Sequence, residues 1–393
     1  MKIKIFLFLA FLSLVIFWSC EKKEPFLKEE GIDSVKSDED VSDNDSSKKI
    51  GNFTLDDFLK ENKRLYSSVE RIFNSLGREE EKVAQMIVTF GGKLGKSDDY
   101  VEKVIREKKA GGVLLLGGSK EYMISTIQKL KKEIKKNNYL PLFFMVDGEP
   151  SLISNKISGI PKFEPTSDIK AEKNRTVAKK ITSVIKEMGF NMNLAPVCDL
   201  PNNKEIIGNR SYGSKERIIK LSTEFIEESH KQNVLATAKH FPGHGRVKGD
   251  SHKELVYLSG KLDEEIQIFK SIIDSGVLCI MVGHIAVKDG PYSTDGKPAT
   301  LSPKIINDLL KKQLGFKGLI ITDAMNMGAV SKLSKPSLNA VIAGNDLILF
   351  PSDERVLISS IVEKMKNDEN FKKQIYNSVK KIIRMKLCLG LMN

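Results

Sequence analysis

Eight short apolar runs recur along the chain, and the longer segments between them carry apolar residues at helical spacing. Short runs that are apolar throughout are typical of parallel strands buried on both faces. The predicted strands are residues 86–90, 112–116, 142–147, 192–196, 234–241, 279–284, 318–323 and 346–350. A helix at residues 55–76 is expected to precede the first of them.

Strands that alternate with helices in this way predict an α/β fold of the (β/α)8 TIM-barrel type. The alternative is an open doubly wound sheet, but no glycine-rich phosphate loop follows the first predicted strand. In a barrel the carboxyl ends of all strands meet at one mouth, so polar residues that end strands become candidate site residues. These candidates are Asp147, Pro196, Lys239, His240, His284 and Asp323.

The N-terminus predicts export. Residues 1–20 hold Lys2 and Lys4, then an apolar run too short to span a membrane, and end at Cys20. This pattern indicates a lipoprotein signal peptide whose Cys20 becomes lipidated, with an ordinary signal peptide as the alternative. Residues 21–50 are rich in Ser, Asp, Glu and Lys and predict a flexible tether, followed by one catalytic domain at 51–393. We expect a membrane-anchored protein in the periplasm or at the cell surface.

The formal charge of +12 does not predict a nucleic-acid partner. Lysines are scattered over polar helix faces, and no basic run is interleaved with aromatic residues. Cys198, Cys279 and Cys388 lie in apolar surroundings, which favours buried free thiols over a disulfide framework.

Residues 239–252, KHFPGHGRVKGDSH, hold three of the chain's five histidines. Pro242, Gly243 and Gly245 interrupt regular structure here and predict a loop over the barrel mouth. Asp250 and His252 are two residues apart, so the carboxylate can bond one imidazole nitrogen and leave the other facing a substrate. Such pairing favours imidazolium and makes His252 a candidate general acid that later serves as a base. A zinc site is the competing hypothesis, but no compact helical pair such as HExxH is present.

Seven motifs together resemble glycoside hydrolase family 3, and within it the single-domain β-N-acetylglucosaminidases of the NagZ type. The motifs are KHFPGHG at 239–245, DSH at 250–252, IGNRSYG at 207–213, NMNLAPVCD at 191–199, GGVLLLG at 111–117, ITDAMNMGA at 321–329 and AGNDLIL at 343–349. The resemblance runs from about residue 80 to the end of the chain, and the combination of KHFPGHG with DSH is its most specific part.

The resemblance implies that Asp323 is the nucleophile of a covalent glycosyl-enzyme intermediate and that His252, held by Asp250, is the acid/base. It implies substrate-binding roles for Asp147, Arg210, Lys239 and His240. The implied function is a retaining exo-β-N-acetylglucosaminidase that acts as a monomer on β-linked glycans, with peptidoglycan fragments as a candidate substrate. No metal or organic cofactor is implied.

Two kinds of alternative remain. A phosphorylase, or another family 3 β-glycosidase, would share the same site, whereas a cell-wall-sugar-binding lipoprotein would bind without turnover. The segment DGEPSLISNKISGIP at 147–161 departs from the family pattern, because Pro150, Ser151 and Leu152 stand where Gly-Gly-Arg should begin and no arginine remains. Lys156 is a possible replacement cation, although it lacks the planar fork of arginine. An active enzyme is still expected, because the implied nucleophile and acid/base are present.

Overall fold

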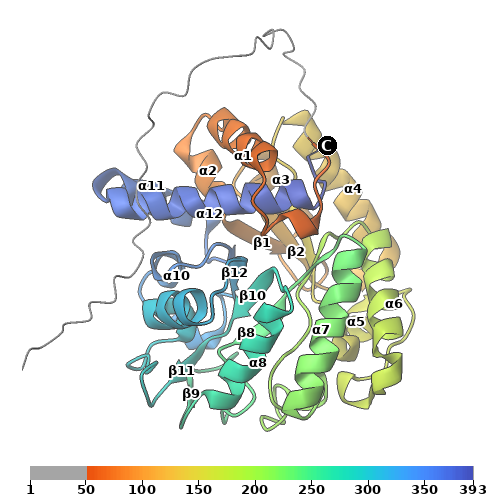
Figure 1. The fold of residues 1–393 in the computed structure, drawn as a ribbon. Coiled ribbons are helices and arrows are strands. Elements are labelled where there is room, and N and C mark those ends of the chain that lie inside the picture. Colours follow the sequence, from red (N-terminus) through yellow and green to blue (C-terminus); the bar gives the residue numbers. More distant parts are fainter. Residues whose placement is uncertain (1–50, 393) are drawn as a thin grey trace, which may run out of the picture. The chain divides into compact units, whose positions relative to one another are not determined.

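Short parallel strands alternate with helices through residues 51–392, the part of the chain that this computed structural model describes (Figure 1). The strands are β1 (Ile87–Gly91), β2 (Gly112–Leu115), β3 (Gly118–Ser119), β4 (Phe143–Val146), β5 (Ile157–Ser158), β6 (Met192–Asn193), β7 (Leu235–Ala236), β8 (Ala238–Phe241), β9 (Val256–Leu258), β10 (Cys279–Val282), β11 (Ile285–Val287), β12 (Leu319–Thr322) and β13 (Ile348–Leu349). Each of the eight predicted apolar runs overlaps at least one of these strands, and the run at 234–241 contains both β7 and β8.

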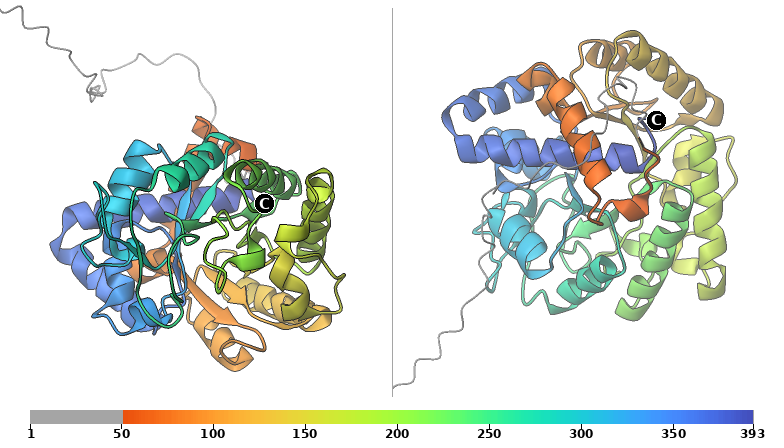
Figure 2. Two further views of the ribbon diagram at one scale, coloured as in Figure 1. Left: turned by 90° about the horizontal axis from the view of Figure 1, so that it is seen from below. Right: turned by 45° about the horizontal axis from the view of Figure 1, so that its top comes forward.

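Helices fill the segments between the strands. The α-helices are α1 (Lys63–Ser75), α2 (Glu79–Ala84), α3 (Asp98–Arg106), α4 (Lys120–Lys136), α5 (Pro150–Lys156), α6 (Asn174–Glu187), α7 (Lys215–Lys231), α8 (Asp263–Asp274), α9 (Gly328–Ser331), α10 (Pro336–Ala343), α11 (Glu354–Asn367) and α12 (Glu369–Cys388). A π-helical segment spans Lys304–Gln313, and short 3-10 helices include η4 (Gly208–Arg210). Figure 2 shows the helices arranged around a central group of strands.

The strands form two main parallel sheets. One has the order β13-β1-β2-β4-β6-β7 and the other the order β12-β10-β8. Isolated bridges connect the two sheets. Ile321 of β12 pairs with Leu347, the residue before β13, and Val197, a few residues after β6, pairs with Lys239 of β8. Only Thr237 separates β7 from β8. The order of neighbouring strands therefore runs from β1 through β7 to β8, and on through β10, β12 and β13 back to β1. The predicted α/β class with a parallel sheet is confirmed.

The two faces of β10 pack into different parts of the core. In β10, Cys279 and Met281 belong to one apolar cluster, whereas Ile280 and Val282 belong to another. Because side chains alternate along a strand, both faces of β10 are buried, which explains why its sequence is apolar throughout.

The prediction of a helix at residues 55–76 is wrong about where the helix starts. A 3-10 turn, η1 (Leu55–Asp57), comes first, and α1 begins only at Lys63. The side chain of Asn62 accepts a hydrogen bond from the amide of Leu65 and thereby caps the first turn of α1. The cap at Asn62 therefore marks the start of the helix, inside the span of the apolar pattern.

The first and last helices of the described chain pack against each other. Phe73 of α1 and Tyr376 of α12 meet edge to face with ring centroids 5.0 Å apart, and Lys380 pairs with Glu70 at 2.7 Å. Within residues 51–392 no helix is long and apolar enough to span a membrane. The predicted signal peptide, Cys20 and the tether lie outside the described residues.

The three cysteines of the described chain, Cys198, Cys279 and Cys388, are free and buried. The prediction of buried thiols is therefore confirmed for these residues.

Candidate active site

A cavity of about 290 Å³ opens where β2, β4, β8, β12 and β13 end. Six of the seven sequence-predicted catalytic and binding residues line it: Asp147, Arg210, Lys239, His240, His252 and Asp323. The seventh, Asp250, bonds His252 from behind. The structure thus brings together residues that lie as much as 176 positions apart in the sequence, from Asp147 to Asp323.

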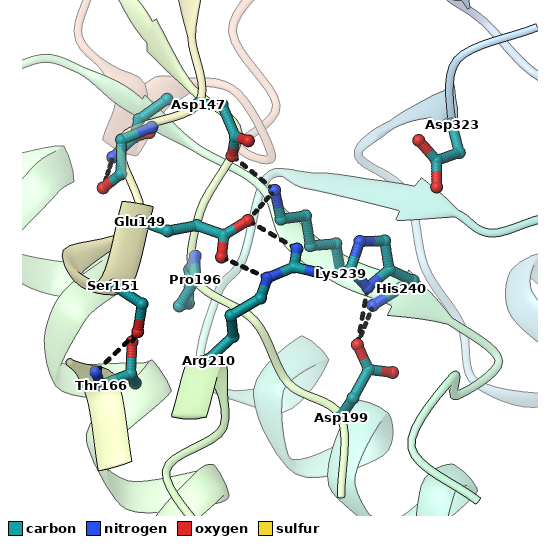
Figure 3. Close-up of polar contacts among 12 residues, drawn as sticks. Asp147, Glu149, Ser151, Thr166, Pro196, Asp199, Arg210, Lys239, His240 and Asp323 are labelled. Carbon is teal, nitrogen blue, oxygen red and sulfur yellow. Dashed lines mark hydrogen bonds and ion pairs between the residues drawn. The ribbon is translucent and has the colours of Figure 1, made fainter. Parts of the chain in front are cut away.

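Four ionic side chains form a chain of contacts along one wall of the cavity (Figure 3). The ammonium of Lys239 lies 2.7 Å from Asp147 and 2.6 Å from Glu149. The guanidinium of Arg210 makes two contacts of 2.7 Å with the carboxylate of Glu149. Because Glu149 is 1% exposed and Lys239 is 3% exposed, these charges hold one another in fixed positions with little screening by solvent.

The electrostatics keep Asp147 ionised. Burial disfavours its carboxylate, but the positive charges of Lys239, Lys156 and Arg210 outweigh burial and hold the pKa of Asp147 well below its usual range. Burial likewise disfavours the charged form of Lys239, yet Asp147 and Glu149 raise the pKa of Lys239 above its ordinary value. A carboxylate and an ammonium that both stay charged provide an acceptor and a donor for sugar hydroxyls.

His240 is oriented by Asp199. Its Nδ1 lies 2.6 Å from Oδ2 of Asp199, which also accepts a hydrogen bond from the His240 amide at 3.1 Å. Asp199 is 1% exposed, and its pKa lies below the usual value, because the attraction of His240 and His244 outweighs the effect of burial. The Nε2 side of the His240 ring is left for a ligand in the cavity.

Asp323 follows β12 directly, and its Oδ1 accepts a hydrogen bond of 2.8 Å from the amide of Ala324. Burial would raise its pKa, but His240, His284 and the Ala324 amide outweigh burial, so the pKa of Asp323 lies below the usual value. A carboxylate that is ionised at neutral pH and lines the cavity meets the requirement for a nucleophile.

Asp250 and His252 form the pair that their spacing predicts. Oδ1 of Asp250 lies 2.7 Å from Nδ1 of His252 and accepts a hydrogen bond of 2.9 Å from the His252 amide. Burial disfavours the Asp250 carboxylate, but these hydrogen bonds outweigh it and lower the pKa of Asp250. The second ring nitrogen of His252, on a side chain that is 59% exposed, is free to exchange a proton with a ligand.

Lys156, the possible replacement cation, is placed at the end of α5 with its ammonium 2.5 Å from Oδ2 of Asp147. Asp147 therefore lies between two lysines, with Lys239 on Oδ1 and Lys156 on Oδ2. Lys156 contacts the predicted binding residue and does not line the cavity itself.

Sequence reasoning missed three residues that hold the predicted ones in place: Glu149, Asp199 and Ser251. Glu149 comes two residues after the strand-end candidate Asp147, and Asp199 ends one of the recognised motifs, so both had a weak positional signal. Their partners lie 41 to 90 positions further along the chain, from Asp199 to His240 and from Glu149 to Lys239, and periodicity cannot reveal such pairings.

The model of the glycosyl hydrolase family 3 N-terminal domain matches residues 79–385. The chain therefore belongs to glycosyl hydrolase family 3 and is a glycosidase. Two relatives, both named beta-hexosaminidase, place it more narrowly. The protein from Tolumonas auensis is 28% identical over 275 residues, covering 64% of this chain and 78% of that protein. The protein from Haemophilus influenzae is 31% identical over 265 residues, covering 62% of this chain and 73% of that protein.

Solved structures agree with this assignment. A glycoside hydrolase family 3 beta-N-acetylglucosaminidase from Paenibacillus sp. is 28% identical with a TM-score of 0.73, over 79% of this chain and 62% of that chain. This chain thus spans less than two thirds of the Paenibacillus enzyme. A beta-N-acetylhexosaminidase from Beutenbergia cavernae has a TM-score of 0.70 over 78% of this chain and 97% of that chain, and at 23% identity it supports the fold alone.

Proposed function

We propose that the chain is a retaining exo-β-N-acetylglucosaminidase. The observation that carries this proposal is that Asp323 and His252, which Asp250 holds, line the same cavity as a set of charged hydroxyl-binding groups. The names of the relatives from Tolumonas and Haemophilus and of the Paenibacillus structure support N-acetylhexosamine as the sugar.

In the first step a carboxylate oxygen of Asp323 bonds to the anomeric carbon while the bond from that carbon to the aglycone oxygen breaks. His252 gives the departing oxygen a proton, and Asp250 stabilises the charged imidazole beforehand. In the second step neutral His252 takes a proton from water, the water oxygen bonds to the anomeric carbon, and the bond to Asp323 breaks. Asp147, Arg210, Lys239 and His240 would hold the sugar hydroxyls throughout.

The test is release of 4-nitrophenol from the β-N-acetylglucosaminide and the β-glucoside by the domain lacking residues 1–50, with and without phosphate. Hydrolysis of the first substrate alone supports the proposal, and phosphate-dependent turnover would reassign the protein as a phosphorylase. Asp323→Ala should abolish turnover and keep sugar binding. A wild-type protein that binds N-acetylglucosamine without turnover would contradict the enzymatic function.

Two observations support a complete (β/α)8 barrel as the fold. The order of neighbouring strands returns to β1, and the candidate site lies at the carboxyl ends of the strands.

The N-terminal sequence supports the further proposal that the enzyme is exported and anchored by lipid at Cys20. Cys20→Ser should release the protein from membranes, and unchanged membrane association would contradict the anchor. Peptidoglycan fragments are the proposed natural substrate, and release of N-acetylglucosamine from purified muropeptides tests this part separately.

A further inference from the structure

Ser251 stands between the two members of the acid/base pair, and its side chain bonds His244, a second histidine that lines the same cavity. Its Oγ lies 2.8 Å from Nε2 of His244, and the residue is 2% exposed. The neighbouring His252 side chain is 59% exposed. Ser251 is therefore buried although the next residue is exposed, and its side chain bonds a histidine seven positions earlier in the chain.

His244 is itself fixed in position. Its amide donates a hydrogen bond of 2.6 Å to Oδ1 of Asp199, the carboxylate whose other oxygen holds His240. Among the described residues Nδ1 of His244 has no partner, and burial lowers the pKa of His244 to about 4. The ring is therefore neutral at ordinary pH, with one donor and one acceptor nitrogen, and Nε2 is the nitrogen that meets Ser251.

The backbone of the same loop rests on the segment that follows the nucleophile. The carbonyl of His252 accepts a hydrogen bond of 2.8 Å from the amide of Gly328, and the carbonyl of Ser251 accepts one of 3.3 Å from Ala329. A Cβ on Gly328 would lie 2.2 Å from the carbonyl oxygen of Lys253, so the two segments approach more closely than any other residue permits. These backbone contacts hold the loop against the segment that follows the nucleophile, and the bond between Ser251 and His244 is a separate tie made by side chains.

We propose that the hydrogen bond between His244 and Ser251 is a latch that positions the Asp250–His252 pair for proton transfer, which makes His244 and Ser251 positioning residues. This inference rests on the proposed function. Asp250 holds the His252 ring, but both belong to the same short loop and move with it. His244 ties that loop to Asp199 and hence to the sugar-binding His240. Loss of the latch should leave the Asp250–His252 pair intact and move it relative to the aglycone oxygen.

Leaving-group dependence separates misplaced proton transfer from a general loss of structure. A phenyl aglycone needs a proton to depart, whereas a 2,4-dinitrophenyl aglycone leaves without one. We expect Ser251→Ala and His244→Ala to lower kcat/KM about tenfold or more on phenyl N-acetylglucosaminide and less than about threefold on the dinitrophenyl substrate, since acid/base catalysis contributes on the order of a hundredfold or more. The ratio of the two values does not depend on the fraction of folded enzyme.

Conservative variants sharpen the test. Ser251→Thr keeps a hydroxyl, and His244→Gln places an amide nitrogen near the position of Nε2, so each should recover part of the lost ratio. The double variant His244→Ala with Ser251→Ala should lose little more than either single variant, because both changes remove the same hydrogen bond. Ser229→Ala is the matched control. It removes a buried hydroxyl that bonds the carbonyl of Phe225 within α7, and it should leave the ratio unchanged.

Azide supplies a second readout. A small anionic nucleophile needs no general base, so azide should speed the turnover of dinitrophenyl substrate by Ser251→Ala more than by wild type and yield the glycosyl azide. In a variant that retains the wild-type Tm, an equal loss of kcat/KM on the two substrates, or no loss, would overturn the proposed latch and leave the proposed function standing. Absence of wild-type turnover on both substrates would overturn the proposed function and the latch with it.

Discussion

Glu149 and Arg210 face each other in a two-point ion pair, with Nε to Oε2 and Nη2 to Oε1 both at 2.7 Å. The pair fixes the plane of the guanidinium, which a single contact would leave free to rotate. Glu149 comes from the start of α5 and Arg210 from η4, so the pair also joins two separate loops at the edge of the cavity. Because Glu149 also contacts Lys239 at 2.6 Å, one buried carboxylate orients two of the proposed sugar-binding cations.

Glu149→Gln should therefore weaken substrate binding without touching a reacting group. A hydrogen bond to a charged partner contributes roughly 1.5–3 kcal/mol, so kcat/KM should fall about 10- to 100-fold, mainly through KM. Steady-state kinetics on the 4-nitrophenyl substrate measure this effect. Glu227→Gln is the control, since Glu227 pairs with Arg175 at a site where both side chains are more than 40% exposed. An unchanged KM in Glu149→Gln would contradict the positioning role.

Lys156→Met should shift the acid limb of the pH profile upward. The pKa of Asp147 is held well below its usual range, with Lys156 among the responsible charges, so removal of that charge lets the pKa rise toward its ordinary value. Substrate binding that needs ionised Asp147 is then lost at a higher pH as the solution is acidified. Values of kcat/KM measured from neutral pH downward, after a check that the enzyme survives each pH, show the shift. Lys156→Arg keeps the charge and should retain the wild-type limb.

Lys386, which lies outside the site, should make the free energy of unfolding depend on pH. Its ammonium is buried, donates to Gln85 at 2.7 Å and to the carbonyl of Gly111 at 3.0 Å, and contacts no carboxylate among residues 51–392. Burial lowers the pKa of Lys386 from 10.5 to about 7. Between these values the unfolded chain binds a proton that the folded chain does not, so the free energy of unfolding should rise with pH by up to about 1.4 kcal/mol per unit.

Denaturant unfolding from about pH 7 to about pH 9.5 measures this slope, and Lys386→Met should flatten it. Lys135→Met, at an exposed position on α4, should leave the slope as in wild type. The same slope in wild type and in Lys386→Met would show that the folded protein keeps Lys386 charged across this range.

Gly245→Ala should destabilise the loop that carries His244. A Cβ at this position would lie 2.0 Å from the carbonyl oxygen and 2.5 Å from the amide nitrogen of Leu200, so the main chain at Leu200 would have to shift. Overpacking of this kind costs roughly 1–3 kcal/mol, so Tm should fall by several degrees and activity should fall with it. Gly77→Ala, where a Cβ meets nothing within 4 Å, is the matched control. A wild-type Tm in Gly245→Ala would contradict the close approach.

The strands and most of the site follow from local sequence pattern. β10 and β12 are apolar on both faces, and Asp323 and Asp147 stand where such runs end, so a parallel fold already places them at one edge. The Asp250–His252 contact is equally local, since its members are two positions apart. The helix start at Lys63 was missed because one capping side chain, Asn62, overrides a continuous apolar pattern.

The supporting residues could not be predicted in the same way. Glu149 and Asp199 act through partners that reach them only when separate strands come together, and no spacing along the chain encodes which lysine or histidine each will meet. Ser251 gave no signal, because a serine between two functional residues fits an exposed loop as well as a buried latch. Long-range pairing of polar side chains thus marks the limit of what the pattern predicts.

The buried thiols have a consequence for how the folded domain responds to oxidants. Burial raises the pKa of Cys198, Cys279 and Cys388 to about 12 each, so almost none of the reactive thiolate exists at neutral pH, and solvent does not reach the sulfur atoms. Oxidants and thiol exchange partners act on accessible thiolates. Once folded, the described domain should therefore keep these thiols unreacted, and its stability should be the same in a reducing and in an oxidising solution.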